Sequence, residues 1–245
     1  MLLRSSGALA LALALLLQAV SAGGGTAAAD PTGRHQTLLG QSVDGRPIVA
    51  IETGDFDAPD RVLIVGCIHG NETAGIAIAN RLAHDPPPRE LNLWIVPVLN
   101  PDGAAADTRG NAHGVDLNRN FPWHWRPMSG VFASGPRPLS EREARIAHAL
   151  ILRLHPHLTV WFNQHRDLVD ESGGNLAIER RFAALTGMRL ARLRREPGSV
   201  VGWENHRDPA ATAFVVELPA GALSAAAVTQ FARAVREVSH GWAHR

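Results

Sequence analysis

The 245-residue chain contains no tyrosine, no lysine and a single cysteine, and each of these absences excludes a kind of chemistry. All 24 basic residues are arginine, so Schiff-base or P-loop lysine chemistry and acid–base catalysis by tyrosine are excluded. One cysteine allows neither a disulfide within the chain nor a structural zinc site built from cysteines. The formal net charge of +1 excludes a strong overall positive field, so we expect no nucleic-acid partner. The 12 histidines are therefore the main source of catalytic potential.

The remaining composition is that of an ordinary globular protein. Hydrophobic residues make up 45% of the chain and charged residues 19%, and the mean hydropathy is -0.05. These values exclude a disordered chain and a membrane protein with many spans. The length favours one domain over two small ones.

The first 22 residues have the three parts of a secretory signal peptide. Arg4 stands near the start, residues 8–17 are apolar, and small residues lead up to Ala22. The alternative is an uncleaved membrane anchor, but the apolar run falls short of the ~20 residues that a spanning helix needs. We expect a signal peptide at 1–22, a flexible lead at 23–35, one domain at 36–245 and no stable membrane anchor after cleavage. The expected location is the periplasm or the exterior of a bacterium.

The rest of the chain alternates between strand-like and helix-like segments. A hairpin is predicted at 37–42 and 47–53, and continuous apolar runs predict buried strands at 61–67, 91–99, 158–162 and 213–218. Helices are predicted at 74–83, 140–154, 175–185 and 223–238, the second opened by a capping box of Ser140 and Glu143. This order predicts an α/β fold, a three-layer α/β/α sandwich with a mixed, mostly parallel sheet. In such sheets the chemistry collects beyond the carboxyl ends of the strands.

The buried strand at 61–67 leads directly into a histidine and a glutamate. His69 and Glu72 stand at a strand-to-helix turn, where a nitrogen and a carboxylate can face one point. This pair is half of a His/His/Glu catalytic zinc site, which leaves one position open for water. A chance match or a capping glutamate is the alternative reading, and the place at a strand end favours the metal.

A long polar loop and a strand glutamate add two further candidates. Residues 108–122 hold Arg109 and Arg119 in a loop long enough to suggest a function, and arginines can bind a carboxylate or stabilise an oxyanion. Glu217 ends an apolar strand, where a carboxylate must be paired, coordinated or raised in pKa. The position of Glu217 predicts a general base, and the alternative is an ion-paired glutamate at a strand end. For the loop, the alternative is a solvated connection with ordinary surface arginines.

Four motifs together resemble the zinc metallocarboxypeptidase family, from about residue 36 to the end of the chain. In order and approximate spacing they are His69-x-x-Glu72, Asn-Pro-Asp-Gly at 100–103, Asp-Leu-Asn-Arg-Asn-Phe-Pro at 116–122 and Val-Glu-Leu-Pro at 216–219. The compact chain looks most like the murein peptide amidase A branch. The missing tyrosine points the same way, because digestive members of the family close a mobile tyrosine over the substrate. The resemblance implies an α/β sandwich around a mixed sheet of about eight strands.

The resemblance also implies one Zn²⁺ per chain, held by His69 and Glu72, with Asp116 hydrogen-bonded to His69. The third ligand is where this chain departs from the family. Relatives in the amidase branch have a histidine directly after an aromatic pair, and this chain has Asn163 there. Alternate residues of a strand share a face, so His165 is predicted to complete the metal site. The alternative is a weakened or metal-free relative that binds without hydrolysis.

On the substrate side, the resemblance implies that Arg109 stabilises the oxyanion and that Asn118 and Arg119 bind a free carboxylate. Glu217 would take a proton from water and pass it to the leaving amine. The expected function is that of an exported zinc carboxypeptidase or amidase acting on a small peptide with a free carboxylate. The favoured substrate bond is the γ-D-glutamyl–diaminopimelate bond of murein peptides. The expected assembly is a monomer or small homo-oligomer. The alternatives are an N-acyl amino acid deacylase of the aspartoacylase type and a pseudo-peptidase that binds cell-wall peptides.

Overall fold

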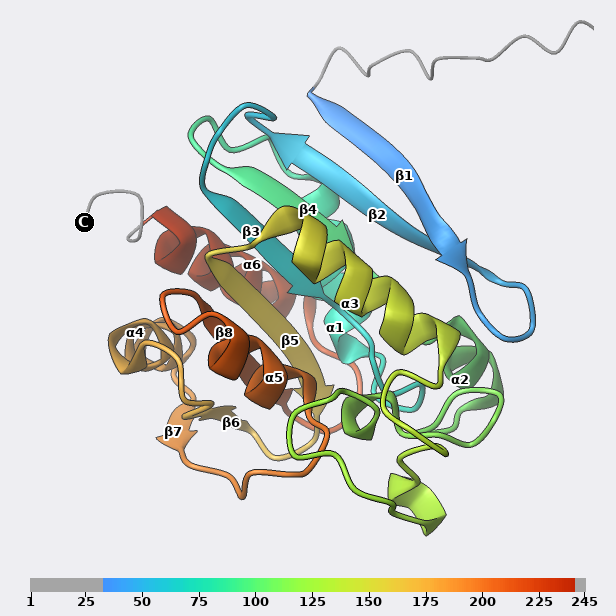
Figure 1. The fold of residues 1–245 in the computed structure, drawn as a ribbon. Coiled ribbons are helices and arrows are strands. Elements are labelled where there is room, and N and C mark those ends of the chain that lie inside the picture. The colour runs from blue at the N-terminus through green and yellow to red at the C-terminus, as the bar shows by residue number, and fades with distance from the viewer. Residues whose placement is uncertain (1–32, 241–245) are drawn as a thin grey trace, which may run out of the picture.

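One eight-stranded sheet organises the computed structural model, which describes residues 33–240 (Figure 1). The expected signal peptide, and all but the last residues of the expected lead, lie outside this range. The spatial strand order is β1-β2-β4-β3-β5-β8-β6-β7. The strands are β1 (Arg34–Gln41), β2 (Pro47–Gly54), β3 (Arg61–Val65), β4 (Asn92–Val96), β5 (Leu158–Gln164), β6 (Leu168–Asp170), β7 (Arg189–Ala191) and β8 (Thr212–Leu218).

The centre of the sheet is parallel and its edges are mixed. Strands β4, β3, β5 and β8 run parallel to one another, β1 and β2 form the expected antiparallel hairpin, and β6 returns antiparallel to β8. Continuous apolar sequence explains the centre, since every residue of β4 and β8 is buried. The prediction of a mixed, mostly parallel sheet of about eight strands is confirmed.

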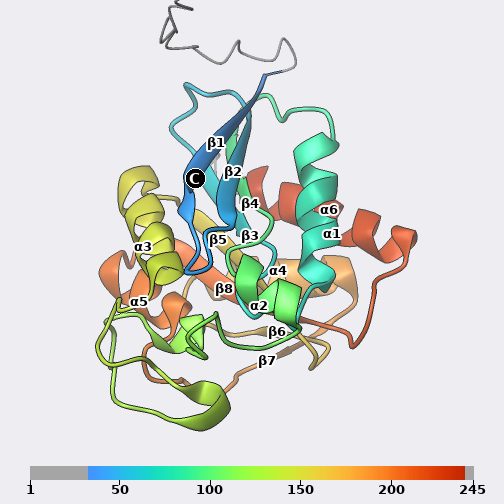
Figure 2. The same ribbon diagram turned by 90° about the vertical axis from the view of Figure 1, so that its right-hand side faces the viewer.

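Helices cover both faces of the sheet, which confirms the three-layer architecture (Figure 2). Helices α1, α4 and α6 pack on one face, and α3 and α5 on the other. The helices are α1 (Ala74–His84), α2 (Pro101–Ala106), α3 (Arg142–Leu154), α4 (Leu176–Thr186), α5 (Val200–Arg207) and α6 (Ala225–His240), with 3₁₀ turns η1 (Leu117–Arg119) and η2 (Gly130–Phe132). Among residues 33–240, no helix combines the length and the apolar character that a membrane crossing requires.

Alternation along the central strands decides which side chains reach the site. In β5, Val160 and Phe162 pack toward α1, α4 and α6, whereas Trp161 belongs to the core beneath α3 and α5. In β8, Val216 packs on the side of α1, α4 and α6, and Val215 packs on the side of α3 and α5. Period-two geometry therefore places the next residues of the α5 side, at 163 and 217, together at the carboxyl ends of the two strands.

The prediction that a capping box of Ser140 and Glu143 opens the second helix is wrong. Helix α3 begins at Arg142, and its N-cap residue Glu141 makes no side-chain capping hydrogen bond. The Glu143 carboxylate instead accepts hydrogen bonds from the Val43 amide at 3.1 Å and from Asn111 Nδ2 at 3.0 Å. The Glu143 carboxylate therefore binds residues far away in the sequence and not the backbone at the start of its own helix.

Candidate active site

The predicted residues converge beyond the carboxyl ends of β3, β5 and β8. His69 and Glu72 lie between β3 and α1, Asn163 is in β5, and Glu217 is in β8. Strand register places Asn163 directly beside Glu217. Parallel strands bring these ends to one edge of the sheet, as the sequence predicted.

His69 is buried and held by carboxylates on both sides of its ring. Its Nδ1 lies 2.8 Å from Glu72 Oε2, and its Nε2 lies 3.1 Å from Asp116 Oδ1. Arg109 connects the two carboxylates, because its Nε donates to Asp116 Oδ2 and its Nη1 to Glu72 Oε1, both at 2.8 Å. The backbone amide of Gln164 also donates to Glu72 Oε2, at 2.9 Å. The Asp116–His69 contact expected from the family resemblance is present.

The two contacts of His69 indicate a place for a cation. An ionised carboxylate only accepts hydrogen bonds, so Nε2 carries the proton that faces Asp116. In the neutral ring Nδ1 then presents a lone pair to the Glu72 carboxylate. Nδ1 and Glu72 Oε2 would then be two acceptors 2.8 Å apart, which requires either a second proton on the ring or a cation bound to both atoms. Burial opposes a charged ring, yet Asp116 and Glu72 raise the pKa of His69 above its ordinary value. An imidazole nitrogen and a carboxylate oxygen that require a positive charge fit a zinc ion.

Asp116 is placed by its own loop. Its side chain caps η1, where Oδ1 accepts a hydrogen bond from the Asn118 amide at 2.9 Å. Burial would raise the pKa of Asp116, but His69 and then the guanidiniums of Arg109 and Arg119 lower it overall. The carboxylate is therefore ionised and able to fix the orientation of the His69 ring.

The structure places His165 just beyond the end of β5, where it lines the same cavity as Glu72, Asn163 and Glu217. Strand β5 ends at Gln164, so the alternation that would carry His165 onto the face of Asn163 stops one residue too early. The His165 side chain is exposed, and within residues 33–240 no group of three His, Cys, Asp or Glu side chains is arranged to hold a metal. Asn163 occupies the strand end instead. Its Oδ1 is buried and has no hydrogen-bond partner among the described residues.

Arg119 and Asn118 present donors on the other side of the site. Asn118 Oδ1 accepts a hydrogen bond from the Val200 amide at the start of α5, at 3.0 Å. Arg119 Nη1 donates to the Asn118 carbonyl at 2.8 Å, while its buried Nε has no partner in the described part of the chain. Burial lowers the pKa of Arg119, against the opposing effect of Asp116. A buried guanidinium with a free donor can bind a carboxylate strongly.

A glycine lets α5 approach this arginine closely. Gly198 has a φ of +70°, in the left-handed region, and a Cβ there would stand 2.2 Å from the Arg119 carbonyl oxygen. Its carbonyl accepts from the Phe121 amide at 3.0 Å, and its amide donates to the Trp123 carbonyl at 2.9 Å. Only glycine combines this conformation with this contact.

Phe132, which the sequence did not single out, belongs to the site. Its ring lies 5.3 Å from the guanidinium carbon of Arg109 and 5.6 Å from that of Arg119, both within the range of a cation–π contact. It stands in η2, and its side chain is partly exposed in the cavity. No local pattern marks an aromatic residue in an irregular loop, so only the fold reveals that it touches both arginines.

Glu217 is a buried carboxylate with altered acidity. Burial raises its pKa to about 7, and the negative charge of Glu72 acts in the same direction. Arg166, His69 and Arg109 oppose the rise. Its Oε2 has no hydrogen-bond partner among residues 33–240. A carboxylate of this acidity can both accept and release a proton near neutral pH.

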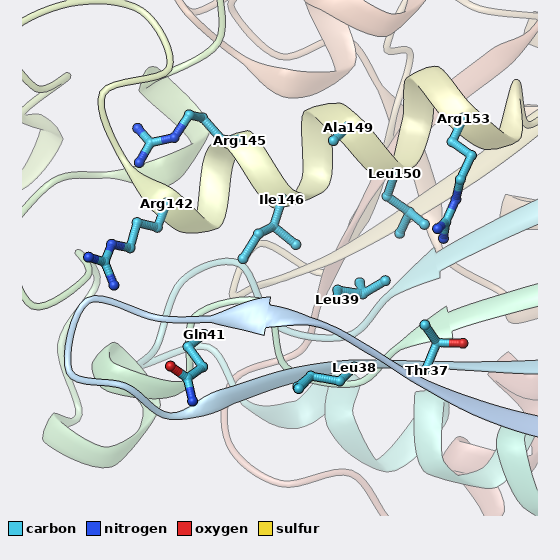
Figure 3. A pocket seen from close by; sticks show the side chains of 10 residues that line it. All are labelled: Thr37, Leu38, Leu39, Gln41, Arg142, Arg145, Ile146, Ala149, Leu150 and Arg153. Carbon is cyan, nitrogen blue, oxygen red and sulfur yellow. The ribbon is translucent and has the colours of Figure 1, made fainter. Parts of the chain in front are cut away.

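These side chains share one cavity of about 580 Å³. Its lining joins the proposed base, the metal-side carboxylate and the arginines, in the set Glu72, Arg109, Asn118, Arg119, Phe132, Asn163 and Glu217, among others. A second hollow of about 450 Å³ lies between β1 and α3 and is lined by Leu38, Ile146 and three arginines (Figure 3). It contains none of the predicted site residues.

A mixed α/β/α sandwich with an imidazole, two carboxylates and a pair of arginines at the strand ends agrees with the zinc metallocarboxypeptidase resemblance of the sequence motifs. The chain belongs to the zinc carboxypeptidase family of peptidase M14, whose model matches residues 25–162. The matched range includes His69, Glu72 and the loop with Arg119. It ends immediately before Asn163.

Sequence similarity to individual proteins supports the same family. Murein peptide amidase A of Escherichia coli (strain K12) is 30% identical over 142 residues, which is 51% of this chain and 57% of that protein. Carboxypeptidase SOL1 of Arabidopsis thaliana is 36% identical over 107 residues, or 37% of this chain and 22% of that protein. The chain thus spans only part of the length of the curated relatives it matches.

Solved structures share the fold. The murein-tripeptide amidase MpaA from Escherichia coli O157 superposes with a TM-score of 0.70 at 23% identity, covering 83% of this chain and 91% of that one. Carboxypeptidase A from Helicoverpa armigera gives a TM-score of 0.71 at 19% identity, covering 86% of this chain and 68% of that one. The prediction of a carboxypeptidase-like fold is confirmed.

Proposed function

We propose that this protein is an exported zinc-dependent amidase that hydrolyses an amide bond beside a free carboxylate. The observation that carries the proposal is the shared cavity. Arg119, with an unpartnered donor, and Glu217, with an unpartnered carboxylate oxygen, both line it. One group can hold the substrate's charge while the other moves a proton. The favoured substrate is the γ-D-glutamyl–diaminopimelate bond of a murein peptide.

Substrate binding begins at the carboxylate. Arg119 Nε is a buried donor that gains a partner when a carboxylate enters, and the contact of Asn118 Oδ1 with Val200 leaves the amide nitrogen of Asn118 for the ligand. Charge-assisted hydrogen bonds of this kind contribute about 1.5–3 kcal/mol each. The neighbouring amide bond is thereby brought toward Glu217.

Glu217 then performs the proton transfers. With a pKa of about 7 it can take a proton from the attacking water and deliver it to the leaving nitrogen. Arg109, fixed by Glu72 and Asp116, supplies positive charge beside the scissile carbonyl. Zinc, when held by His69 and Glu72, would supply Lewis-acid activation of water and of the carbonyl oxygen.

Two relatives support a murein peptide as the substrate. The curated murein peptide amidase A matches half of this chain, and the structure of a murein-tripeptide amidase has the same fold. The signal peptide expected at residues 1–22 supports export, which would place the protein where cell-wall peptides occur.

The experiment is hydrolysis of the tripeptide L-alanyl-γ-D-glutamyl-diaminopimelate by the purified zinc-loaded protein. We expect release of free diaminopimelate, detected by mass spectrometry, and a loss of about 10²–10⁴-fold in kcat for Glu217→Gln with zinc content unchanged. Glu237→Gln, which alters an exposed glutamate on α6, serves as the matched control. Zinc-loaded protein that leaves both this tripeptide and a panel of C-terminal peptides intact would refute the proposal.

One observation favours a second candidate function, binding without hydrolysis. Asn163 stands where a third strong zinc ligand is expected, and a site without stable metal would bind a peptide carboxylate but not cleave its amide bond. Isothermal titration of the tripeptide into metal-free protein, beside the hydrolysis assay, separates the two functions. Binding with no turnover at saturating zinc would support this candidate. Turnover of N-acyl amino acids alone would indicate a deacylase.

A further inference from the structure

Asn163 has an environment that is unusual for an amide side chain. It is 4% exposed, and Oδ1 lacks a hydrogen-bond donor among the residues that the structure describes. A buried polar atom left without a partner loses its hydration without gaining a hydrogen bond, which destabilises the fold. Such an atom calls for an explanation, and a bound cation is one.

The residue that carries the unpartnered oxygen is next in sequence to a backbone contact with the metal-side carboxylate. The backbone amide of Gln164, the residue after Asn163, donates to Glu72 Oε2 at 2.9 Å, so the end of β5 is joined directly to the Glu72 carboxylate. Both side chains line the same cavity. His69 Nδ1 faces the same carboxylate oxygen at 2.8 Å. An imidazole nitrogen, a carboxylate oxygen and an unpartnered amide oxygen are thus contributed by His69, Glu72 and the end of β5.

We propose that Asn163 Oδ1 is the third protein ligand of the metal, in a His69–Glu72–Asn163 set. This inference rests on the metal dependence in the proposed function and assigns a residue to it. The set has one nitrogen donor and two oxygen donors, of which the amide oxygen is uncharged. Imidazole favours zinc, whereas carboxylate and carbonyl oxygens also suit harder ions such as Mn²⁺. The site therefore binds zinc less tightly, and prefers it over manganese less strongly, than a site with two histidines.

The test is direct metal binding to metal-free protein, measured by competition with a chromophoric chelator for Zn²⁺ and for Mn²⁺. The wild-type protein should bind one zinc per chain. Asn163→Leu, which keeps the approximate volume but removes the ligand, should weaken zinc binding by about tenfold or more, the scale of losses at residues that support metal sites. Asn163→His should strengthen zinc binding by about tenfold or more and raise the preference for zinc over manganese.

His165→Ala is the matched control, because His165 is the rival ligand two residues away. It should leave the affinity for both metals unchanged. Cobalt gives an independent readout, since its visible absorption depends on the ligand atoms. The Co²⁺ spectrum should change in Asn163→His and stay the same in His165→Ala. Circular dichroism of each metal-free variant verifies folding, and if Asn163→Leu does not fold, the comparison of Asn163→His with His165→Ala carries the test.

Three outcomes would overturn the assignment. These are unchanged zinc affinity in a folded Asn163→Leu, loss of affinity in His165→Ala, and an Asn163→His protein that binds zinc no better than the wild type. Failure of this inference is distinct from failure of the proposed function. Zinc bound through Asn163 without release of diaminopimelate refutes only the function. Release of diaminopimelate by an enzyme whose zinc depends on His165 refutes only the ligand assignment.

Discussion

Glu204 on α5 gives a stability prediction that does not depend on the proposed activity. The side chain is 7% exposed and lies against β5, where Oε1 accepts a hydrogen bond from Trp161 Nε1 at 2.7 Å and Oε2 accepts one from Thr159 Oγ1 at 2.8 Å. Burial raises the pKa of Glu204 from its ordinary 4.5 to about 7, although both hydrogen bonds oppose the rise. Above about pH 7 the folded protein therefore holds a buried carboxylate that forms no ion pair with any of residues 33–240.

The magnitude follows from the difference between the two pKa values. Between pH 4.5 and about 7 the folded state keeps a proton that the unfolded chain has released, so the stability of the wild type falls as the pH rises through this window. Above about pH 7 the full cost is present, and at 1.36 kcal/mol per pKa unit it amounts to roughly 3 kcal/mol. Glu204→Gln removes this dependence, because a neutral amide can accept from Trp161 and pair with the Thr159 hydroxyl.

Urea unfolding at pH 5 and pH 8, followed by tryptophan fluorescence, measures the effect. We expect Glu204→Gln to be close to the wild type in stability at pH 5 and more stable by about 3 kcal/mol at pH 8. Glu90→Gln, which alters an exposed glutamate and keeps Glu204, should match the wild type in stability at both pH values. A Glu204→Gln difference that is the same at both pH values would refute the reasoning, because it would mean that burial does not disfavour the ionised form.

Three further predictions concern the site. Arg119→Lys should raise KM for the murein tripeptide by about tenfold with a smaller change in kcat, because a lysine cannot reproduce the guanidinium's paired donors; steady-state kinetics measure it, and an unchanged KM would contradict the carboxylate role. Asp116→Asn should weaken zinc binding by about 10–100-fold, as chelator competition would reveal, because it loses the negative charge that orients His69; equal affinity would show that the contact is incidental. Phe132→Leu should raise KM by a few fold through loss of cation–π contacts worth about 0.5–1 kcal/mol each, and a change in kcat alone would argue against it.

Strong local patterns predicted the fold correctly. The apolar runs that became β3 and β8 were predicted as buried strands, and parallel strands bring their ends to one edge of the sheet. Glu72 and Glu217, far apart in sequence, could therefore be placed in one site from their positions at strand ends. The cavity that both residues line agrees with this reasoning.

Two helices were missed because their residues are weak helix formers. Asn-Pro-Asp-Gly at 100–103 is typical of a turn, yet Pro101 opens α2 and Asn100 Oδ1 accepts a capping hydrogen bond from the Gly103 amide. Helix α5 contains Gly202 but is fixed by packing and by its Ser199 cap. Tertiary contacts decide such short segments, and local propensity does not.

The site details that the sequence missed all depend on long-range geometry. The prediction that His165 binds the metal extended strand alternation past the point where β5 ends, and it stays a prediction. The ion pairs from Arg109 to Glu72 and Asp116 join three separate segments, and no spacing rule foretells them. The sequence shows which residue types stand at the strand ends, but only the folded structure shows which of their atoms are in contact.

The most direct test of the central claim is to compare two forms of one substrate. The claim is that a free carboxylate beside the scissile bond is held by Arg119 and Asn118 while Glu217 moves the proton. The murein tripeptide and its counterpart with the diaminopimelate α-carboxylate converted to an amide differ only in that charge. Loss of two charge-assisted hydrogen bonds, at about 1.5–3 kcal/mol each, predicts a kcat/KM at least about 100-fold lower for the amide. Equal cleavage of both tripeptides would contradict the account.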